Sequence, residues 1–207
     1  MATYIIVTVL AYLIGSISFS VIIGRKMAGI DVREKGSKNA GTTNVLRTVG
    51  KKAAIITLIC DILKGVIAIV IALIAGNIAK NTDESLLIQL AGIFVILGHT
   101  FPIFFEFKGG KGVATALGVL LITNYQIGLI CLVFALIIMI FTKMVSAGSV
   151  TAAILFPVLT VFIHGHYIVQ GNYIIFGIIV AALVIFNHRT NIKRILDGTE
   201  NKLSFKK

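Results

Sequence analysis

Charged residues are scarce in this chain. They make up 13% of its 207 residues, whereas an average soluble protein carries roughly 25%. Hydrophobic residues make up 57%, and apolar runs of about 18 or more residues recur along the whole length. These proportions exclude an ordinary soluble domain and predict several segments that span a membrane.

Cysteine is also scarce. The two cysteines, Cys60 and Cys131, both fall inside apolar segments. We therefore expect buried thiols that pack as small hydrophobic side chains, not a disulfide or a zinc site. The sequence also contains no cluster of His, Cys, Asp and Glu with the spacing of metal ligands. We expect no metal, and no nucleic-acid partner, since the net charge of +11 lies in short segments between the apolar runs.

Strict alternation of apolar and polar residues is missing too, because the apolar runs are continuous. Backbone polar groups must be paired internally within a bilayer, so these runs predict helices and exclude a β-barrel. We expect an all-α, polytopic integral membrane protein that forms a single domain over residues 1–207. Seven apolar segments can be marked, at about 4–24, 53–75, 86–105, 112–123, 127–142, 147–163 and 172–187.

The basic residues predict a topology. Most of them lie in the stretch 25–52 and in the tail after Asn187, and Lys and Arg collect on the cytoplasmic side of membrane proteins. Seven alternating spans satisfy this rule, with the N-terminus outside and the C-terminus in the cytoplasm. The segment 112–142 could be one kinked helix or two short helices. The seven-span count needs two, because a single helix would place loop 106–111 and the tail on opposite faces.

The stretch from Gly36 to Arg47, GSKNAGTTNVLR, is rich in glycine and in short hydrogen-bonding side chains. Such residues favour a folded loop with directional hydrogen bonds over a plain solvated connector. Arg47 can hold a phosphate with two parallel hydrogen bonds, which a lysine cannot do. The alternative is a capped turn with an arginine at the lipid surface.

The stretch from Phe105 to Gly118, FEFKGGKGVATALG, places close-set glycines directly before an apolar segment. Glycines allow backbone N–H groups to approach an anion, and the helix that follows adds its positive end. Lys108 and Lys111 add point charges, so the loop predicts a phosphate site at a bilayer surface. The spacing is not that of a Walker A loop. The alternative is that the glycines serve close helix packing.

Two polar residues follow the last apolar segment directly. His188 and Asn191 stand three positions apart, so a continuing helix would present both on one face. This pair indicates a functional site. The alternative is a basic amphipathic tail that lies on anionic lipid.

Two pairs of polar residues lie within the predicted spans or at the start of one. Charges within a membrane are costly and face a cavity or each other, and Asp61 and Lys64 are spaced to meet along one helix face. Lys64 is therefore either half of a structural ion pair or a substrate-binding lysine. Ser146 and Ser149 lie near the start of the sixth segment, where they either bond between helices or face a site.

The sequence resembles the bacterial glycerol-3-phosphate acyltransferases that depend on acyl phosphate, the PlsY family. The matching stretches occur in order over nearly the whole chain: GSISFSVIIGR at 15–25, GSKNAGTTNVLR at 36–47, DILKG at 61–65, GHTFPIFFEFKGGKGVAT at 98–115 and HRTNIKRILDGTE at 188–200. The resemblance implies a multi-pass enzyme of the bacterial cytoplasmic (inner) membrane with its site at the cytoplasmic face. It implies transfer of an acyl group from acyl phosphate to the 1-hydroxyl of glycerol 3-phosphate, giving lysophosphatidic acid and phosphate.

The same resemblance assigns roles to individual residues. The catalytic set that it implies is Ser37, Arg47, Lys111, Ser149, His188 and Asn191. Substrate contacts would come from Thr43, Gly109, Gly110 and Lys111, with Lys64 as a further candidate and Glu200 as a structural residue. No cofactor, metal or coenzyme A thioester is implied. The acyl phosphate would come from a peripheral soluble enzyme.

The route of the proton from the glycerol hydroxyl has two possible answers. His188 could act as a general base, or the substrate's own phosphate could accept the proton. We favour the phosphate, with His188 and Asn191 as positioning donors. The thioester-dependent acyltransferases instead use a His-x4-Asp motif. The positions five residues after the four histidines hold Phe104, Val169, Gly171 and Lys193, so that chemistry is excluded.

The rival hypothesis is a small membrane transporter of an anionic phosphorylated solute. A transporter would need charges near the bilayer midplane. Only Asp61 and Lys64 fit that requirement, whereas the other polar motifs gather at one face. A membrane scaffold without catalysis would leave the glycine- and lysine-rich loop unexplained.

Overall fold

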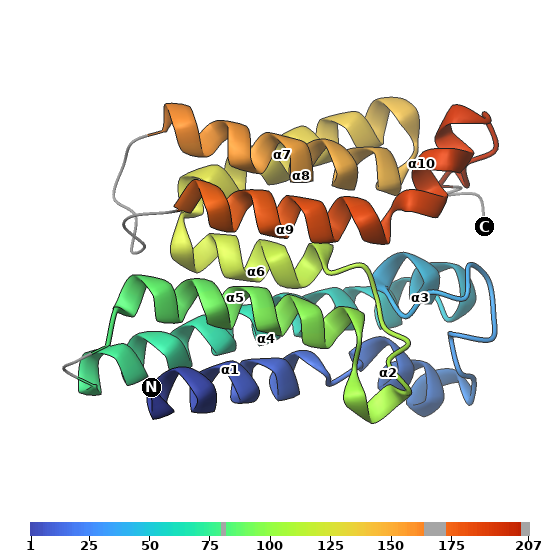
Figure 1. Ribbon diagram of the computed structural model, residues 1–207. Coiled ribbons are helices and arrows are strands. Elements are labelled where there is room, and N and C mark those ends of the chain that lie inside the picture. Colours follow the sequence, from blue (N-terminus) through green and yellow to red (C-terminus); the bar gives the residue numbers. More distant parts are fainter. Residues whose placement is uncertain (80–81, 164–172, 204–207) are drawn as a thin grey trace. The chain divides into compact units, whose positions relative to one another are not determined.

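The computed structural model describes residues 1–79, 82–163 and 173–203, and no strand occurs among them. Its elements are α1 (Ala2–Gly15), α2 (Phe19–Ala28), α3 (Thr42–Thr48), α4 (Lys51–Ile78), α5 (Glu84–Thr100), the 3-10 helix η1 (Ile103–Phe105), α6 (Val113–Thr123), α7 (Tyr125–Thr142), α8 (Val145–Phe162), α9 (Tyr173–Asn187) and α10 (Arg189–Leu196) (Figure 1). The predicted all-helical class is confirmed. The chain divides into two compact units, Met1–Thr123 and Asn124–Lys207.

Among the described residues, five helical stretches are long and apolar enough to cross a membrane, and the bent pair α9–α10 makes a sixth if it counts as one span. The five are Ala2–Ala28, Lys51–Ile78, Glu84–Phe105, Tyr125–Thr142 and Val145–Phe162. α6 is also apolar but has only 11 residues. Each of the seven apolar segments expected from the sequence coincides with one or two of these helices.

The stretch 112–142 forms two helices, as predicted. α6 ends at Thr123, and Asn124 caps α7, because its side-chain carbonyl accepts a hydrogen bond from the Ile127 N–H at 3.0 Å. α7 ends before Lys143, which adopts a left-handed conformation with φ 60°.

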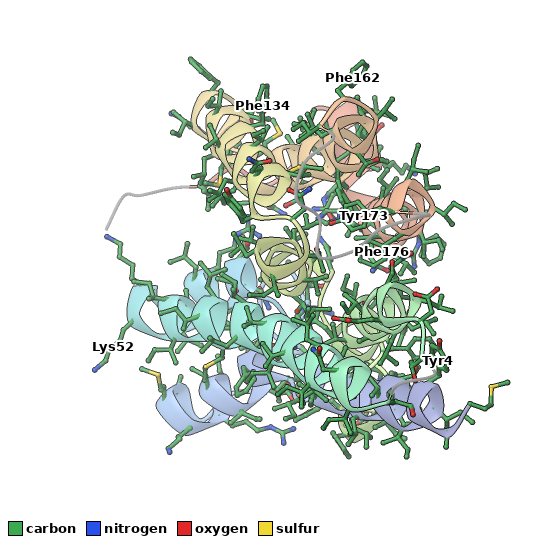
Figure 2. All side chains as sticks on the ribbon, turned by 90° about the vertical axis from the view of Figure 1, so that its left-hand side faces the viewer. Tyr4, Lys52, Phe134, Phe162, Tyr173 and Phe176 are labelled. Carbon is green, nitrogen blue, oxygen red and sulfur yellow. The ribbon has the colours of Figure 1, made fainter. Side chains whose placement is uncertain are left out.

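The helices carry apolar side chains on their surfaces and polar side chains inside. Phe134 and Phe162 are 47% and 76% exposed and point outward (Figure 2). Thr57, Asp61 and Lys64 are at most 2% exposed. A water-soluble protein shows the reverse arrangement. Exposed apolar side chains on so many long helices suit the hydrocarbon core of a bilayer.

In the first unit, α1, α4 and α5 lie side by side (Figure 1). Glycines allow the close approach of α1 and α5: a Cβ at Gly15 would overlap the Val95 carbonyl, and a Cβ at Gly98 would overlap the Tyr12 carbonyl. α4 and α6 meet in the same way at Gly118. Small residues at helix contacts are typical of membrane proteins, because they let backbones pack directly.

The first span differs from the predicted segment 4–24. The helix breaks at Ser16, and α2 then continues to Ala28. At Ser16 the hydroxyl and the backbone N–H both donate to the Tyr12 carbonyl, at 2.8 and 2.9 Å, and these bonds close the last turn of α1. The polar stretch 25–52 therefore begins within a helix.

In the second unit, α7, α8 and α9 lie side by side (Figure 1). Aromatic rings join α8 to α9. Phe156 packs edge to face against Tyr173 and Phe176, with ring centroids 5.8 and 6.0 Å apart. Such pairs add specific geometry to the burial of large apolar surfaces.

The sequence allows a last apolar helix that continues through His188 and Asn191. The structure shows that it does not continue straight. The chain bends by 62° between α9 and α10, with His188 at the junction. At this junction the Val184 carbonyl oxygen accepts the His188 N–H at 3.1 Å and lies 2.7 Å from the imidazole Nδ1.

Both cysteines are free thiols. Cys131 is buried as predicted, whereas Cys60 is only partly buried. Cys60 shares a face of α4 with Ile56 and Leu63, which are 37% and 47% exposed, and residues three and four apart lie on the same side of a helix.

Candidate active site

The loop before α3 is organised by the side chain of Asn44. This side chain is 1% exposed, and its Oδ1 accepts a hydrogen bond from the Ser37 N–H at 2.8 Å. Its Nδ2 donates to the carbonyls of Val32 and Lys35 at 2.6 and 3.1 Å. Gly36 has φ +58°, and a Cβ there would overlap Asn44 Oδ1, so this position requires glycine. The loop therefore holds Ser37 at the surface.

The predicted residues of this first motif lie in that loop and in α3. Ser37 is exposed, Thr43 lies half-buried in the first turn of α3, and Arg47 is exposed in its last turn. The motif is thus a closed loop followed by a helix, not a bare connector. An arginine in the last helical turn also complements the negative end of the helix dipole.

The second motif begins with a tightly bent segment between α5 and α6. Glu106 and Phe107 both have φ 57°, in the left-handed region that non-glycine residues rarely occupy. Such conformations persist where surrounding contacts hold them. The Phe107 N–H donates to the Pro102 carbonyl at 2.9 Å, and Lys108 pairs with Glu106 at 3.1 Å on the surface. The bend leads directly into the glycine pair.

The backbone N–H groups of Gly109 and Gly110 point at the end of α5. They donate to the carbonyls of Thr100 and His99 at 3.1 and 3.0 Å. A Cβ at Gly109 would overlap the His99 carbonyl, and a Cβ at Gly110 would overlap His99 Nε2. In this structure both N–H groups are therefore bonded to backbone carbonyls, and an anion contact through them stays a prediction. The glycines allow the loop to pack against α5, and Lys111 follows immediately.

The loops of the two motifs touch each other at one end of the first unit (Figure 1). The Ala40 N–H donates to the Gly109 carbonyl at 3.4 Å, and Arg33 donates to the Phe105 carbonyl at 2.8 Å. Asp31 fixes Arg33 through an ion pair of 2.8 Å. Hydrogen bonds from Arg33 hold the pKa of Asp31 well below its usual range, against the opposite effect of partial burial.

These contacts join the two loops. Six of the predicted residues lie in the loops or in α3, which follows the first loop: Ser37, Thr43, Arg47, Gly109, Gly110 and Lys111.

A buried cluster lies behind the glycine pair. Lys64 Nζ is 2.8 Å from Asp61 Oδ1, 2.7 Å from His99 Nδ1 and 3.2 Å from the Ile17 carbonyl oxygen. The predicted contact between Asp61 and Lys64 is confirmed. Lys64 has three polar protein neighbours, as many as its ammonium group has N–H bonds.

Sequence reasoning did not assign His99 to this cluster. His99 is 7% exposed and stands at the end of α5, directly before the bend that leads to the glycine pair. Its place in the stretch GHTFP, close to the glycine-rich loop, was the available signal. Asn44 was also missed, although it belongs to the first motif.

In the second unit, the carboxylate of Glu200 accepts three hydrogen bonds. Ser146 and Asn191 donate to its Oε1 at 2.7 Å each, and Arg194 donates to its Oε2 at 2.8 Å. Burial alone would raise the pKa of Glu200, but these hydrogen bonds outweigh it and lower the pKa below its ordinary value. Glu200 therefore ties α8 to α10 and fixes the side-chain amide of Asn191.

His188, Asn191 and Ser149 are all buried, at 3%, 5% and 7% exposure. The Nδ1 of His188 must donate to the Val184 carbonyl, because a carbonyl only accepts, so Nε2 is the acceptor atom of the neutral ring. The Ser149 hydroxyl donates to the Val145 carbonyl at 2.9 Å. Buried positions contradict the alternative that His188 and Asn191 merely face lipid as part of an amphipathic tail.

Comparison with known proteins gives a consistent result. The family model for glycerol-3-phosphate acyltransferase matches residues 5–198. The glycerol-3-phosphate acyltransferase of Clostridioides difficile (strain 630) is 44% identical over 205 residues, which cover 99% of this chain and 98% of that protein. The protein of the same name from Fusobacterium nucleatum is 45% identical over 198 residues, covering 95% and 96%.

Two similar crystal structures are of PlsY (YgiH), described as an integral membrane glycerol 3-phosphate acyltransferase. Its glycerol 3-phosphate form has a TM-score of 0.85 and 39% identity and covers 97% of this chain and 96% of that one. Its lysophosphatidic acid form has a TM-score of 0.83, with the same identity and 97% and 95% coverage.

Proposed function

This chain belongs to the glycerol-3-phosphate acyltransferase family and acylates glycerol 3-phosphate to lysophosphatidic acid, and we propose that its acyl donor is an acyl phosphate. The hydroxyl oxygen attacks the acyl carbon and forms the ester bond, while the bond from that carbon to the phosphate oxygen breaks. Inorganic phosphate leaves, and the hydroxyl proton goes to a phosphate. An acyl phosphate is a mixed anhydride whose leaving group departs without a strong acid.

The observation that supports the proposal is the contact between the two motif loops in the first unit. Ser37 and Lys111 belong to these loops, and Thr43 and Arg47 belong to α3, which follows the first loop directly. Arg47 and Lys111 hold phosphate groups by charge-assisted hydrogen bonds, and Ser37 and Thr43 add hydroxyl contacts. Gly109 and Gly110 contribute by shaping the loop. Holding two anionic substrates together supplies most of the catalysis, through proximity and charge neutralisation.

We assign the second-unit residues to positioning. His188 and Asn191 orient reacting groups by hydrogen bonds, Ser149 contributes a hydroxyl, and Glu200 keeps Asn191 in place. The proton from the glycerol hydroxyl passes to a substrate phosphate, not to His188. Burial of His188 with Nδ1 fixed on a backbone carbonyl supports a ring held in one orientation.

The enzyme is expected in the bacterial cytoplasmic membrane as a single catalytic domain with seven spans, the N-terminus outside and the tail in the cytoplasm. α6 serves as the fourth span, although its 11 residues reach only about 16 Å. Six of these 11 residues are buried, and backbone enclosed by protein is tolerated at membrane depth. The positions of the basic residues support this orientation. A peripheral soluble enzyme supplies the acyl phosphate.

One assay tests the donor. The purified protein in detergent micelles receives glycerol 3-phosphate with either acyl phosphate or the matching acyl coenzyme A. We expect lysophosphatidic acid and inorganic phosphate in equal amounts from acyl phosphate, and no product from the thioester. Equal or faster turnover of the thioester would overturn the proposal. Because micelles enclose no compartment, turnover there also contradicts the transporter hypothesis.

A second assay tests the topology. Single cysteines at Ala2 and Lys202, introduced after Cys60 and Cys131 are replaced by serine, are labelled in intact cells with a membrane-impermeant maleimide. Labelling at position 2 alone is expected. Labelling at both positions would refute an odd number of spans.

A further inference from the structure

The buried cluster of Asp61, Lys64 and His99 lies directly behind the glycine pair. We propose that His99, anchored by Lys64, is a positioning residue that fixes Gly110 and thereby places Lys111 for the phosphate of glycerol 3-phosphate. This inference rests on the proposed phosphate contact of Lys111. It gives Lys64 an indirect role in substrate binding, in place of direct contact.

The hydrogen bond between Lys64 and His99 fixes the imidazole. Lys64 is paired with Asp61 at 2.8 Å and is therefore a charged ammonium group, which can only donate. At 2.7 Å from Lys64 Nζ, the Nδ1 of His99 must be the acceptor. The proton of the neutral ring then lies on Nε2, on the side that faces Gly110.

His99 holds the glycine pair from two sides. Its backbone carbonyl accepts the Gly110 N–H at 3.0 Å, and its ring stands against the Gly110 Cα so closely that a Cβ there would overlap Nε2. The same imaginary Cβ would lie 2.8 Å from the Ala40 carbonyl oxygen. Gly110 is thus confined between the His99 ring and the first-motif loop, and Lys111 is the next residue along the chain.

The rival explanation is that the cluster only stabilises the fold. Removing one member of a buried ion pair is strongly destabilising in any case, so loss of activity alone would not separate the two explanations. The energetic coupling between substitutions of His99 and Lys111 does separate the two explanations. If His99 acts through Lys111, its removal has no further effect once Lys111 is gone, whereas effects on independent properties add.

The experiment is a double-mutant cycle of His99→Asn and Lys111→Ala. Asparagine keeps an acceptor near the place of Nδ1 for Lys64 but removes the part of the ring that confines Gly110. The dissociation constant of glycerol 3-phosphate is measured calorimetrically in micelles, and its KM is measured with saturating acyl phosphate. Thermal unfolding is followed for every variant. The control is Thr57→Val in α4, the helix that carries Lys64. It removes a buried hydroxyl that donates to the Ala53 carbonyl of the same helix.

We expect His99→Asn to weaken glycerol 3-phosphate binding by about tenfold, the equivalent of about 1.4 kcal/mol. In the Lys111→Ala background it should weaken binding by less than about twofold, and Thr57→Val should change the unfolding midpoint but not the dissociation constant. Additive effects of His99→Asn and Lys111→Ala would overturn the inference.

A second variant keeps the test decisive if His99→Asn does not fold. The pair Asp61→Asn with Lys64→Met removes both buried charges and releases the ring, and the same lack of additivity with Lys111→Ala is expected. The binding measurement needs no acyl donor. A wild type that binds glycerol 3-phosphate but does not use acyl phosphate would refute the proposed donor, while the cycle would still decide on His99.

Discussion

Replacing Gly110 by alanine places a methyl group where the glycine-rich loop meets the end of α5. The new Cβ would lie 2.8 Å from the Ala40 carbonyl oxygen and 2.8 Å from His99 Cε1, and closer still to Nε2. Non-bonded carbon contacts are relaxed at about 3.5 Å, so the loop or the ring must move by roughly 0.7 Å or more. Gly110 is not among the residues with positive φ, so the effect comes from contact and not from backbone strain.

Each way of relieving this overlap has a cost. If the ring moves, it leaves Lys64, and a hydrogen bond to a charged group contributes about 1.5–3 kcal/mol. If the loop moves, Lys111 moves with it, and a misplacement of about 1 Å can lower a rate by on the order of 10²-fold. We expect kcat/KM for glycerol 3-phosphate to fall by about 10- to 100-fold, and the free energy of unfolding to fall by about 1–3 kcal/mol.

The assay is steady-state kinetics in detergent, with thermal unfolding of the same samples. Gly29→Ala is the matched control. Gly29 has φ +65° but no atom within 4 Å of its imaginary Cβ, so alanine there introduces strain of about 1–3 kcal/mol without contact. It should lower stability and leave kcat/KM unchanged. A Gly110→Ala enzyme with wild-type kcat/KM would refute the argument that loop position governs activity.

Three further outcomes are expected. Arg47→Lys and Lys111→Ala should each lower turnover by at least about tenfold, because each loses a charge-assisted hydrogen bond of roughly 1.5–3 kcal/mol; Lys52→Ala, exposed and pointing away from the helices (Figure 2), should not. The pKa of Glu200 is lower in the folded state, so its contribution to stability is complete above its unfolded pKa of about 4.3 and is lost as the pH falls through the folded pKa. Lowering the pH from about 6 to 3 should therefore destabilise the wild type more than Glu200→Gln, as measured by thermal unfolding. At His188, glutamine keeps a hydrogen-bonding side chain but is no useful base: activity in His188→Gln well above that of His188→Ala supports positioning, and equal loss in both supports a general base.

The helices could be predicted because hydropathy in a membrane protein depends on local sequence alone. Each long apolar run became helix, and the division of 112–142 followed from the charges of the loops around it. The break after Gly15 and the 62° bend at His188 were not predicted, because they lie within or at the end of apolar runs and hydropathy does not show a change in helix direction there.

The site could be predicted as a set of residues but not as a set of contacts. The sequence indicated that glycines in the loop bring its backbone close to either an anion or a neighbouring helix. It could not show that the partner is the end of α5, because both an anion and a neighbouring carbonyl accept the same N–H groups. Asn44 and His99 were missed because their partners lie in other turns or other helices, at distances along the chain that no local pattern encodes.

Acidic residues are the rarer charge in this chain, with 8 Asp and Glu against 19 Lys and Arg. None occurs within 36–47, 108–115 or 188–191, the stretches that carry every residue of the implied catalytic set except Ser149. Asp31, Glu106 and Glu200 lie near them, but each has a lowered pKa, because arginine or lysine donates to Asp31 and Glu106 and because Ser146, Arg194 and Asn191 donate to Glu200. A carboxylate held in that way is a poor proton acceptor at neutral pH. The proton of the glycerol hydroxyl must therefore go elsewhere, which supports a substrate phosphate as its acceptor and makes the comparison of His188→Gln with His188→Ala the decisive test of the remaining alternative.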